Sequence, residues 1–276
     1  MLSYQHGYHA GNAADLHKHA ILTLVLQYLR RKPKPFTALD VYAGRGLYDL
    51  SGHIAQKTKE ADAGILRAWE QSWPAALGDY RQVLRHCNPH REHLQFYPGS
   101  PTILDQLLPA DSPLQLCELH PQEHNALEKL FERKPRVHIH RRDALEALGG
   151  LLPPTPRRGL VLIDPSYEQG QDYRRVGEAV LQAHQRWPQG VILLWYPLLG
   201  DERHLPMLRN LVASSMPMLQ CEWAYRPRGA GMHGSGMLVV NPPYLLAEQL
   251  NGLSAWFGSL VQAGSPSLLI RPHNLS

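Results

Sequence analysis

The sequence predicts an α/β fold built on a mostly parallel sheet. Short apolar runs alternate along the chain with stretches of helical spacing, which is the order that builds parallel sheets. Successive runs end in an acidic residue, as in G-L-V-L-I-D at residues 159–164. The 276 residues are 43% hydrophobic and 19% charged, enough to bury one large core. We therefore expect a single domain over residues 1–276, with residues 50–98 as an inserted helical subdomain.

Composition narrows the functional classes. No run of about 18 apolar residues occurs, and residues 1–12 are rich in polar and aromatic groups, so we expect neither a membrane span nor a signal peptide. We expect a cytoplasmic protein. Cys87, Cys117 and Cys221 are widely spaced, which fits reduced thiols and gives no tetrahedral metal pattern. The formal charge of +4 favours a polyanionic partner.

The first long helix is predicted to begin with Asp15 as its N-cap and to end near Arg30. Lys18 and His19 would lie in its first turns. On spacing alone, an ordinary solvated helix surface is the favoured interpretation of both side chains.

A strand that starts near Phe36 leads into an acid and two glycines. The spacing Asp40-x-x-x-Gly44-x-Gly46 lets the backbone approach a cofactor closely, and the lack of a third spaced glycine argues against a dinucleotide pyrophosphate. S-adenosylmethionine carries no phosphate, so a tight glycine turn with carboxylates for its ribose hydroxyls suits it. The alternative is a plain strand-to-helix turn.

Residues 50–98 contain no predicted buried strand. Helical spacing covers Ala61–Trp69 and Ala75–His86, with a break between them. The basic side chains of this segment fit either a surface that tracks phosphates or a solvated face. The sequence Y-P-G-S-P then opens a helix through Leu107, where Ser100 either caps the helix or meets a ligand.

Acidic residues follow the ends of successive predicted strands: Asp40, Glu118 in the strand Leu114–Leu119, Asp143 after the strand Val137–His140, and Asp164. The carboxyl ends of parallel strands meet at one edge of a sheet, where ligands bind in open α/β folds. The four acids should therefore share one crevice.

Residues 164–167, D-P-S-Y, carry the clearest chemistry. They are similar to the Asp/Asn-Pro-Pro-aromatic tetrad of methyltransferases that act on exocyclic amines, with Ser166 in place of the second proline. The Asp164 carboxylate and the Pro165 carbonyl can accept the two N–H groups of an adenine amine, which aids attack by its nitrogen. Tyr167 offers a stacking face to a base that has left its helix. The same four residues are also typical of a strand-ending turn.

After this tetrad, the sheet is predicted to close with an antiparallel hairpin. The expected elements are a helix at Tyr173–Trp187, a strand at Val191–Tyr196, a helix at Leu205–Ala213, and hairpin strands at Leu219–Tyr225 and Met237–Asn241. The basic, glycine-rich connection of the hairpin either contacts RNA over the substrate or forms a flexible tip. Residues 241–244, N-P-P-Y, match the tetrad pattern more closely than residues 164–167. They follow the last strand and not the fourth, so we expect their prolines only to end that strand.

Several segments are together highly specific: M-L-S-Y, H-A-G-N-A-A-D and K-H near the start, then Y-P-G-S-P, E-L-H-P, R-R-G-L-V-L-I-D-P-S-Y-E, L-W-Y-P and S-G-M-L-V-V-N-P-P. On these segments the chain resembles, nearly end to end, the bacterial large-subunit (23S) ribosomal RNA adenine-N6 methyltransferases of the J type. The resemblance implies a Rossmann-like methyltransferase fold with a seven-stranded sheet and an antiparallel last strand. It also implies S-adenosylmethionine as cofactor and ribosomal RNA as partner, and we expect a monomer.

By that resemblance, Asp164 is the catalytic acceptor. The cofactor site would comprise His19, Tyr42, Ser100, Glu118, Asp143, Ala144 and Asp164. The substrate side would comprise Tyr4, Lys18, Pro165 and Tyr167. Three positions depart from the family pattern: Tyr42 where His is expected, Ala144 where Gly is expected, and Ser166 where Pro is expected.

Two alternative functions stay open at this stage. The family has also been connected with the use of external DNA as a nutrient, which suggests a DNA-binding or DNA-modifying protein. A binding module without catalysis would follow if Ser166 spoils the turn.

Overall fold

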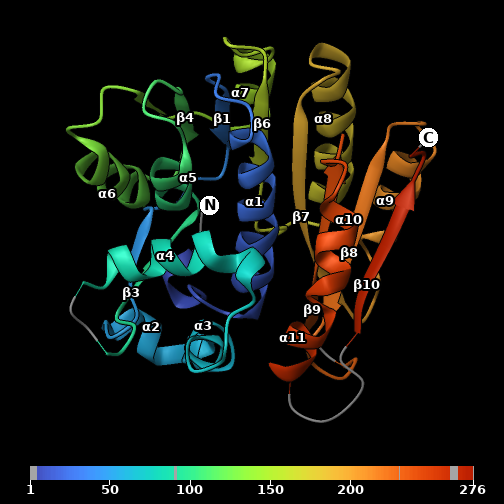
Figure 1. The fold of residues 1–276 in the computed structure, drawn as a ribbon. Helices are drawn as coiled ribbons and strands as arrows, with labels where there is room; N and C mark the ends of the chain where they lie inside the picture. Colours follow the sequence, from blue (N-terminus) through green and yellow to red (C-terminus); the bar gives the residue numbers. More distant parts are fainter. Residues whose placement is uncertain (1–4, 90–91, 230, 262–266, 276) are drawn as a thin grey trace.

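The structure, a computed structural model, describes residues 5–89, 92–229, 231–261 and 267–275. An eight-stranded sheet in the order β10-β8-β9-β7-β6-β1-β4-β5 forms its centre (Figure 1). Five neighbouring strands are parallel: β5 (Val137–His140), β4 (Leu114–Cys117), β1 (Thr37–Asp40), β6 (Gly159–Ile163) and β7 (Val191–Leu199). Each further pair is antiparallel, through β9 (Met232–Val240), β8 (Met218–Ala224) and β10 (Ser267–His273). The predicted α/β class is confirmed.

Strand β6 shows why the sheet needs unbroken apolar runs. All five of its residues are buried. Leu160 and Leu162 join the core that contains α1 (Ala13–Arg30), whereas Val161 and Ile163 join the core that contains α8 (Asp172–Arg186). Successive side chains of a strand point to opposite faces, so a sheet covered on both faces requires apolar residues at every position.

The two faces have different helical covers. The α1 side also receives α4 (Gly78–Cys87), α5 (Ser100–Leu107), α6 (Pro121–Phe131), α10 (Leu246–Gly252) and α11 (Ser254–Ser259). The α8 side also receives α7 (Ala144–Leu151) and α9 (Leu205–Val212). The carboxyl edge of the parallel strands remains between these layers.

Helix α1 is buried along most of its length. Every residue from 13 to 26 is buried, including Lys18 and His19. The interpretation of these two as solvated surface is therefore wrong, because the sheet lies on one side of α1 and α4, α5 and α10 contact the others. The predicted N-cap is also wrong. Asn12 caps the helix by accepting the N–H of Asp15 at 2.9 Å, which places Asp15 inside the first turn.

Residues 50–98 are largely helical, as predicted, and they pack beside α1 (Figure 1). They comprise α2 (His53–Thr58), the 3₁₀ turn η2 (Glu60–Ala63), α3 (Ile65–Trp69), the 3₁₀ turn η3 (Ala75–Leu77) and α4. The expectation that the segment contains no buried strand is wrong, because β3 (Phe96–Pro98), which is buried at two of its three residues, pairs with β2 (Leu47–Asp49) in an antiparallel ladder. Three residues are too few for alternation to be visible in the sequence. The two strands join the ends of the inserted segment.

The inserted segment meets the start of α1 through backbone contact. The N–H of Ile65 donates to the carbonyl of Gly11 at 2.8 Å. A Cβ atom on Gly64 would lie 2.3 Å from that same carbonyl oxygen. Gly11 itself has a φ of +76°, a conformation that favours glycine. The two segments therefore come closer together than any other residue type would allow.

The carboxyl-terminal part confirms the hairpin and adds to it. Strand β9 returns between β7 and β8, as in the predicted antiparallel closure. A further strand, β10, pairs outside β8, so the sheet has one strand more than the seven predicted. β10 contains Pro272, a residue that strands accept mainly at a sheet edge, and β10 lies at that edge.

Candidate active site

A cavity of about 860 Å³ lies at the carboxyl edge of the parallel strands. It brings together every described residue of the predicted cofactor and substrate sites: Lys18, His19, Tyr42, Ser100, Glu118, Asp143, Ala144, Asp164, Pro165 and Tyr167. Tyr4 lies outside the described residues. Of the four strand-end acids, Glu118, Asp143 and Asp164 line this cavity, whereas Asp40 is fully buried and does not. The binding roles of these residues remain predictions.

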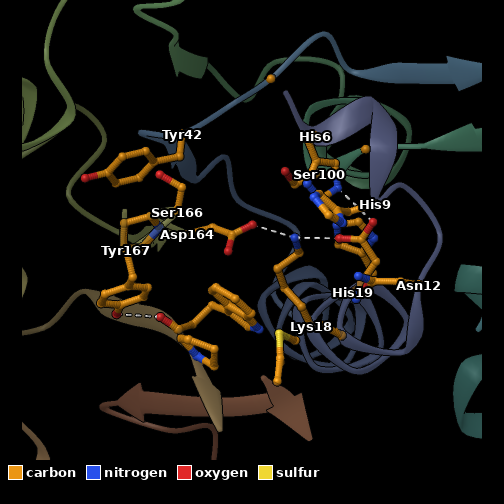
Figure 2. A pocket seen from close by; sticks show the side chains of 18 of the residues that line it. His6, His9, Asn12, Lys18, His19, Tyr42, Ser100, Asp164, Ser166 and Tyr167 are labelled. Atoms are coloured by element: carbon orange, nitrogen blue, oxygen red, sulfur yellow. Dashed lines mark hydrogen bonds and ion pairs between the residues drawn. The ribbon is translucent and has the colours of Figure 1, made fainter. Parts of the chain in front are cut away.

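The D-P-S-Y turn follows β6 and faces the cavity (Figure 2). Tyr167 has a φ of +51°, and its hydroxyl donates to the carbonyl of Trp195 at 2.8 Å. Its ring stacks on Tyr173 with centroids 4.3 Å apart. Ser166 is exposed. The turn is thus anchored through its tyrosine, so a second proline is not the only device that holds it, and Tyr173 covers one face of the ring predicted to stack on a base.

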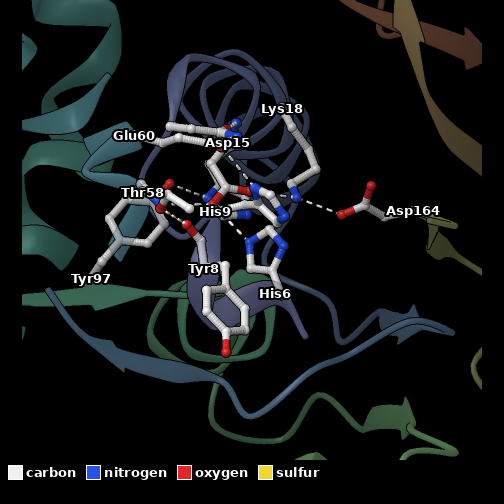
Figure 3. Close-up of polar contacts among 12 residues, drawn as sticks. His6, Tyr8, His9, Asp15, Lys18, Thr58, Glu60, Tyr97 and Asp164 are labelled. Carbon is white, nitrogen blue, oxygen red and sulfur yellow. Dashed lines mark hydrogen bonds and ion pairs between the residues drawn. The ribbon is translucent and has the colours of Figure 1, made fainter. Parts of the chain in front are cut away.

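Lys18 bridges two carboxylates across the cavity (Figures 2 and 3). Its Nζ lies 2.5 Å from Asp164 Oδ2 and 2.7 Å from Asp15 Oδ1. Burial alone would disfavour the ammonium, but the charges of the two carboxylates outweigh it and raise the pKa of Lys18 above its usual range. A permanently charged amine is therefore fixed against the carboxylate of Asp164, whose side chain is 15% exposed.

Asp15 anchors this arrangement from the first turn of α1. Its second oxygen, Oδ2, accepts from His6 Nε2 at 2.8 Å and from the N–H of Gly11 at 2.9 Å (Figure 3). Burial opposes its charge, but His6 and Lys18 hold the pKa of Asp15 well below its ordinary value. The order His6, Asp15, Lys18, Asp164 forms a continuous chain of polar contacts from the amino-terminal segment to the end of β6.

Glu118 holds the glycine turn that follows β1. Its Oε2 accepts the N–H of Gly44 at 2.8 Å, and its Oε1 accepts the N–H of His120 at 2.7 Å. Burial raises the pKa of Glu118, and the two amides partly offset this effect. Because each of its oxygens has a further lone pair, the carboxylate can also accept hydroxyl groups from a ligand in the cavity.

Asp40 lies beneath the same glycine turn. It is fully buried, and burial raises its pKa to about 7 even though the Ser100 hydroxyl and the Tyr42 N–H, which donates to Oδ1 at 3.2 Å, favour the carboxylate. Its Oδ2 atom is buried without a hydrogen-bond partner in the described part of the chain. Such an atom is costly unless water or a ligand satisfies it.

Asp143 and His19 have structural partners as well as a place in the cavity. Asp143 is the N-cap of α7 and accepts the N–H groups of Leu145 at 2.9 Å and Glu146 at 3.2 Å. His19 Nδ1 lies 2.7 Å from the hydroxyl of Tyr97, and burial holds the pKa of His19 well below its usual value. Its Nε2 is buried without a partner in the described part of the chain, so a neutral imidazole retains one nitrogen for a ligand.

Several residues that line the cavity or hold it were missed by sequence reasoning. Asp15 was interpreted only as a helix cap, although its spacing of three from Lys18 could have suggested an ion pair. Trp195 lines the cavity and donates from Nε1 to Ser235 at 2.9 Å. Glu60 lines the cavity from the inserted segment and was not singled out, whereas Arg226 lines it from the hairpin connection that was considered as an RNA contact. No sequence pattern connects those two distant positions with each other.

The N-P-P-Y sequence lies at the opposite edge of the sheet. Val240, which precedes it, pairs with Ile192 near the start of β7. The Asn241 amide donates to the carbonyls of Pro188 at 2.8 Å and Gly190 at 2.7 Å. Tyr244 is 89% exposed. These residues end β9 and tie it to a neighbouring turn, away from the cavity.

Metal binding and membrane insertion are two further properties that bear on function. The described residues contain no group of three or more His, Cys, Asp or Glu side chains placed to hold a metal ion. None of the described helices combines the length and hydrophobicity that crossing a membrane requires.

With this geometry established, comparison with known proteins gives the family. Residues 33–268 match the family model described as "Ribosomal RNA large subunit methyltransferase D, RlmJ". The chain belongs to this family. The family resemblance inferred from the sequence is therefore confirmed.

Named relatives extend the match to nearly the whole chain. The Ribosomal RNA large subunit methyltransferase J of Escherichia coli (strain K12) is 41% identical over 270 residues, covering 96% of each chain. The protein of the same name from Haemophilus influenzae is 36% identical over 272 residues, covering 97% of each chain. A crystal structure of protein LPL1258 from Legionella pneumophila, at 34% identity, superposes with a TM-score of 0.90 and covers 96% of this chain and 98% of that one. The family fold accordingly extends over both the sheet and the inserted segment.

Proposed function

We propose that this protein transfers a methyl group from S-adenosylmethionine to N6 of an adenine in 23S ribosomal RNA. The observation that carries the proposal is the position of Asp164 and Pro165, which follow β6 and line the cavity that is also lined by Glu118 and Asp143. Membership of a family described as ribosomal RNA methyltransferases supports the same reaction class. S-adenosylmethionine supplies an electrophilic methyl group when it is bound.

The chain's own residues would prepare the amine for attack. Lys18 occupies Oδ2 of Asp164, and no hydrogen bond to Oδ1 forms among the described residues. Oδ1 and the carbonyl of Pro165 can then accept the two N–H groups of the adenine amine and hold its nitrogen in line. As positive charge develops on that nitrogen, the carboxylate stabilises it in a site largely shielded from water.

The cofactor side fits a nucleoside that carries a positive charge. Glu118 has acceptor capacity for a ribose diol, and Gly44 allows close approach of the backbone at a φ of +62°. The unpartnered Nε2 of His19, which lines the cavity, is a buried polar atom that a bound ligand or its water would satisfy. Tyr42 and Ala144 line the same cavity, so the departures from the family pattern alter its walls without closing it.

Four further expectations complete the proposal. The enzyme would act as a monomer in the cytoplasm, with structured RNA and not duplex DNA as its substrate. Residues 50–98 would form an inserted subdomain of a single methyltransferase domain. Sedimentation of the purified protein would test the first of these.

The central experiment follows tritiated methyl groups from S-adenosylmethionine into 23S ribosomal RNA purified from cells that lack this enzyme. Digestion to nucleosides and chromatography identify the product, and matched reactions contain duplex DNA. We expect label in N6-methyladenosine from RNA. Label in another nucleoside, or a preference for DNA at equal salt, would contradict the proposal.

A further inference from the structure

The cavity is also lined by residues that belong neither to the strand ends nor to the D-P-S-Y turn. We call this part the outer cavity and define it by Glu60 and Arg67 of the inserted segment and by Trp223, Tyr225 and Arg226 at the end of β8. None of these residues belongs to the predicted cofactor or substrate sets. The inserted segment and the hairpin thus form facing walls, although they are far apart in sequence.

One wall presents a fixed aromatic ring with an arginine beside it. The ring of Tyr225 packs edge-on against Trp223, with centroids 5.2 Å apart. The Arg226 guanidinium lies 6.0 Å from the Tyr225 ring centre. The N–H groups of both residues donate to the carbonyl of His233 at 3.1 Å, which fixes this end of the hairpin. Arg226 is exposed, so its charge is available to a ligand.

The charges of the outer cavity favour an anion. Arg67 and Arg226 form no ion pair within the described residues, whereas Glu60 is already engaged (Figure 3). Glu60 Oε1 lies 2.9 Å from His9 Nδ1, and Oε2 accepts from the Asn12 amide at 3.0 Å. The hydrogen bond to Glu60 raises the pKa of His9, which favours the charged imidazole beside the carboxylate. The charge of Arg226 also favours the Glu60 carboxylate, although the two side chains form no ion pair. The outer cavity therefore contains two arginines and one acid, and His9 and Asn12 already contact that acid.

Trp223, which packs against Tyr225, carries a buried donor. Trp223 is 1% exposed, lines the cavity, and has no partner for its Nε1 among the described residues. A buried N–H group without an acceptor is uncommon in folded proteins, because it has lost water without gaining a hydrogen bond. An acceptor on a ligand would satisfy it.

We propose that the outer cavity binds the nucleotide next to the methylated adenosine in an unpaired stretch of RNA. Its base would stack on Tyr225, and its phosphate would lie between Arg67 and Arg226. A target base must leave its stack to reach Asp164, so its neighbours are presented as single strand. Aromatic faces combined with arginines are the usual means of binding single strands. The inference rests on the proposed function and assigns the substrate's flanking contact within it.

The first test measures binding without any methyl donor. Fluorescein-labelled hexa-adenylate RNA is titrated by anisotropy with the wild type, Tyr225→Ala, Tyr225→Phe and Arg226→Ala. Loss of one stacked base should weaken binding roughly fivefold to a hundredfold in Tyr225→Ala, while Tyr225→Phe keeps the ring and stays within about twofold. Arg226→Ala should also flatten the dependence of log affinity on log salt by about 0.7, the value for one phosphate contact on a single strand.

Arg228 provides the matched control on the same connection. It pairs with Glu202 at 2.9 Å and donates to the carbonyl of Gly200 at 2.8 Å, and it does not line the cavity. Arg228→Ala therefore removes the same charge and should leave both the affinity and the salt slope nearly unchanged. Thermal unfolding of each variant tests for misfolding, and calorimetry with S-adenosylmethionine tests for damage to the cofactor site.

A double-mutant cycle, which combines changes in the RNA with Tyr225→Ala, then identifies the nucleotide that contacts Tyr225. Hexa-adenylates that carry one abasic position are bound more weakly by the wild type, and at one of these positions Tyr225→Ala should show no further loss. Equal effects of Arg226→Ala and Arg228→Ala, or unchanged affinity in Tyr225→Ala, would overturn the inference. If the wild type binds the RNA through Tyr225 but incorporates no methyl group, the proposed function fails while the binding site stands.

Discussion

Residues 164–167 and residues 241–244 are nearly the same motif in two different places. D-P-S-Y follows β6, one of the parallel strands, and therefore lies at the carboxyl edge beside the cavity. N-P-P-Y follows β9, which runs antiparallel to β7, and therefore lies at the amino edge. By composition, the second motif is the closer match to an amino-methyltransferase tetrad. The direction of the preceding strand decides which of them meets the acids.

Their side chains differ accordingly. Asp164 meets the ammonium of Lys18, whereas the amide of Asn241 is used on two backbone carbonyls. Tyr167 is 8% exposed and stacked, whereas Tyr244 is 89% exposed. A short motif therefore has catalytic meaning only together with the sheet edge that presents it.

The largest expected effect is on chemistry at the first motif. Asp164→Ala should lower the rate of methyl transfer by ~10² to 10³, because one charged acceptor in a shielded site contributes about 2.7 to 4 kcal/mol to the transition state. Tritiated methyl incorporation into unmethylated 23S ribosomal RNA measures this rate. If Asn241→Ala proves inactive and Asp164→Ala active, with both proteins folded, then residues 241–244 and not residues 164–167 form the catalytic motif.

The second effect concerns the predicted cofactor site, which lies in the same cavity as the first motif. Glu118→Ala should weaken S-adenosylmethionine binding by a factor of about 10 to 150, which corresponds to the roughly 1.5 to 3 kcal/mol of hydrogen bonds to a charged group. Isothermal calorimetry measures the affinity. Glu132→Ala, which removes an exposed acid at the end of α6, is the control and should leave binding unchanged. Equal affinity in all three proteins would remove Glu118 from the site.

At the second motif, we expect a loss of stability and not of chemistry. Asn241→Ala should lower the free energy of unfolding by about 1 to 3 kcal/mol, since two carbonyls lose their donor. The φ of +52° adds strain for alanine, so Asn241→Gly should be less destabilised. Urea unfolding gives the stabilities, and the rate per folded molecule should match the wild type. A selective loss of rate would show that the second motif takes part in the reaction.

A smaller effect, on folding stability, concerns the pair formed by His9 and Glu60 and depends on pH. The hydrogen bond to Glu60 raises the pKa of His9, and although burial opposes it, the hydrogen bonds from His9 and Asn12 hold the pKa of Glu60 below its ordinary value. The pair therefore stabilises the fold above the range in which Glu60 is protonated, and this stability is lost as pH rises through the raised pKa of His9. Glu60→Gln should cost about 0.2 to 1 kcal/mol near pH 6 and less at pH 9. A cost that does not vary with pH would exclude the charged pair.

The smallest effect belongs to Tyr244. Its exposure of 89% means that Tyr244→Ala removes little packing, and we expect a change within about 0.5 kcal/mol in unfolding free energy and no change in activity. Tyr167→Ala is the paired variant. It should lower both the unfolding free energy and the activity, because it removes a stacked ring and the hydrogen bond to Trp195. Similar behaviour of the two variants would erase the distinction between the motifs.

These contrasts also show what sequence alone could provide. The run at 159–163 predicted β6 because a strand buried on both faces needs apolar residues at every position, and the acid after it marked the edge. The burial of Lys18 was not predictable in the same way. Its neighbours along the helix look polar, and only the fold brings Asp164 to it. The spacing of apolar residues predicts secondary structure, whereas an ion pair between a helix and the turn after a strand depends on tertiary contacts.

Two strands, β3 and β10, were missed for a related reason. β3 has three residues and depends on pairing with β2, so its own sequence carries little information. β10 was not predicted because Pro272 is atypical of strands, and its place at the sheet edge explains why it is tolerated. The outer cavity depends on walls contributed by residues near 60 and near 225, a proximity that no local pattern encodes.

The contact between Gly64 and Gly11 limits how this architecture can be recombined. The three atoms nearest to a Cβ at position 64 are all backbone: the oxygen of Gly11 at 2.3 Å, the carbonyl carbon of Asn12 at 2.5 Å and the nitrogen of Ala13 at 2.8 Å. A library randomised at this codon should retain glycine alone, since no rotamer change can relieve a clash with main chain. A homologous segment grafted in place of residues 50–98 would need to bring a glycine to the same point, or it would displace the helix start that carries Asp15 and Lys18.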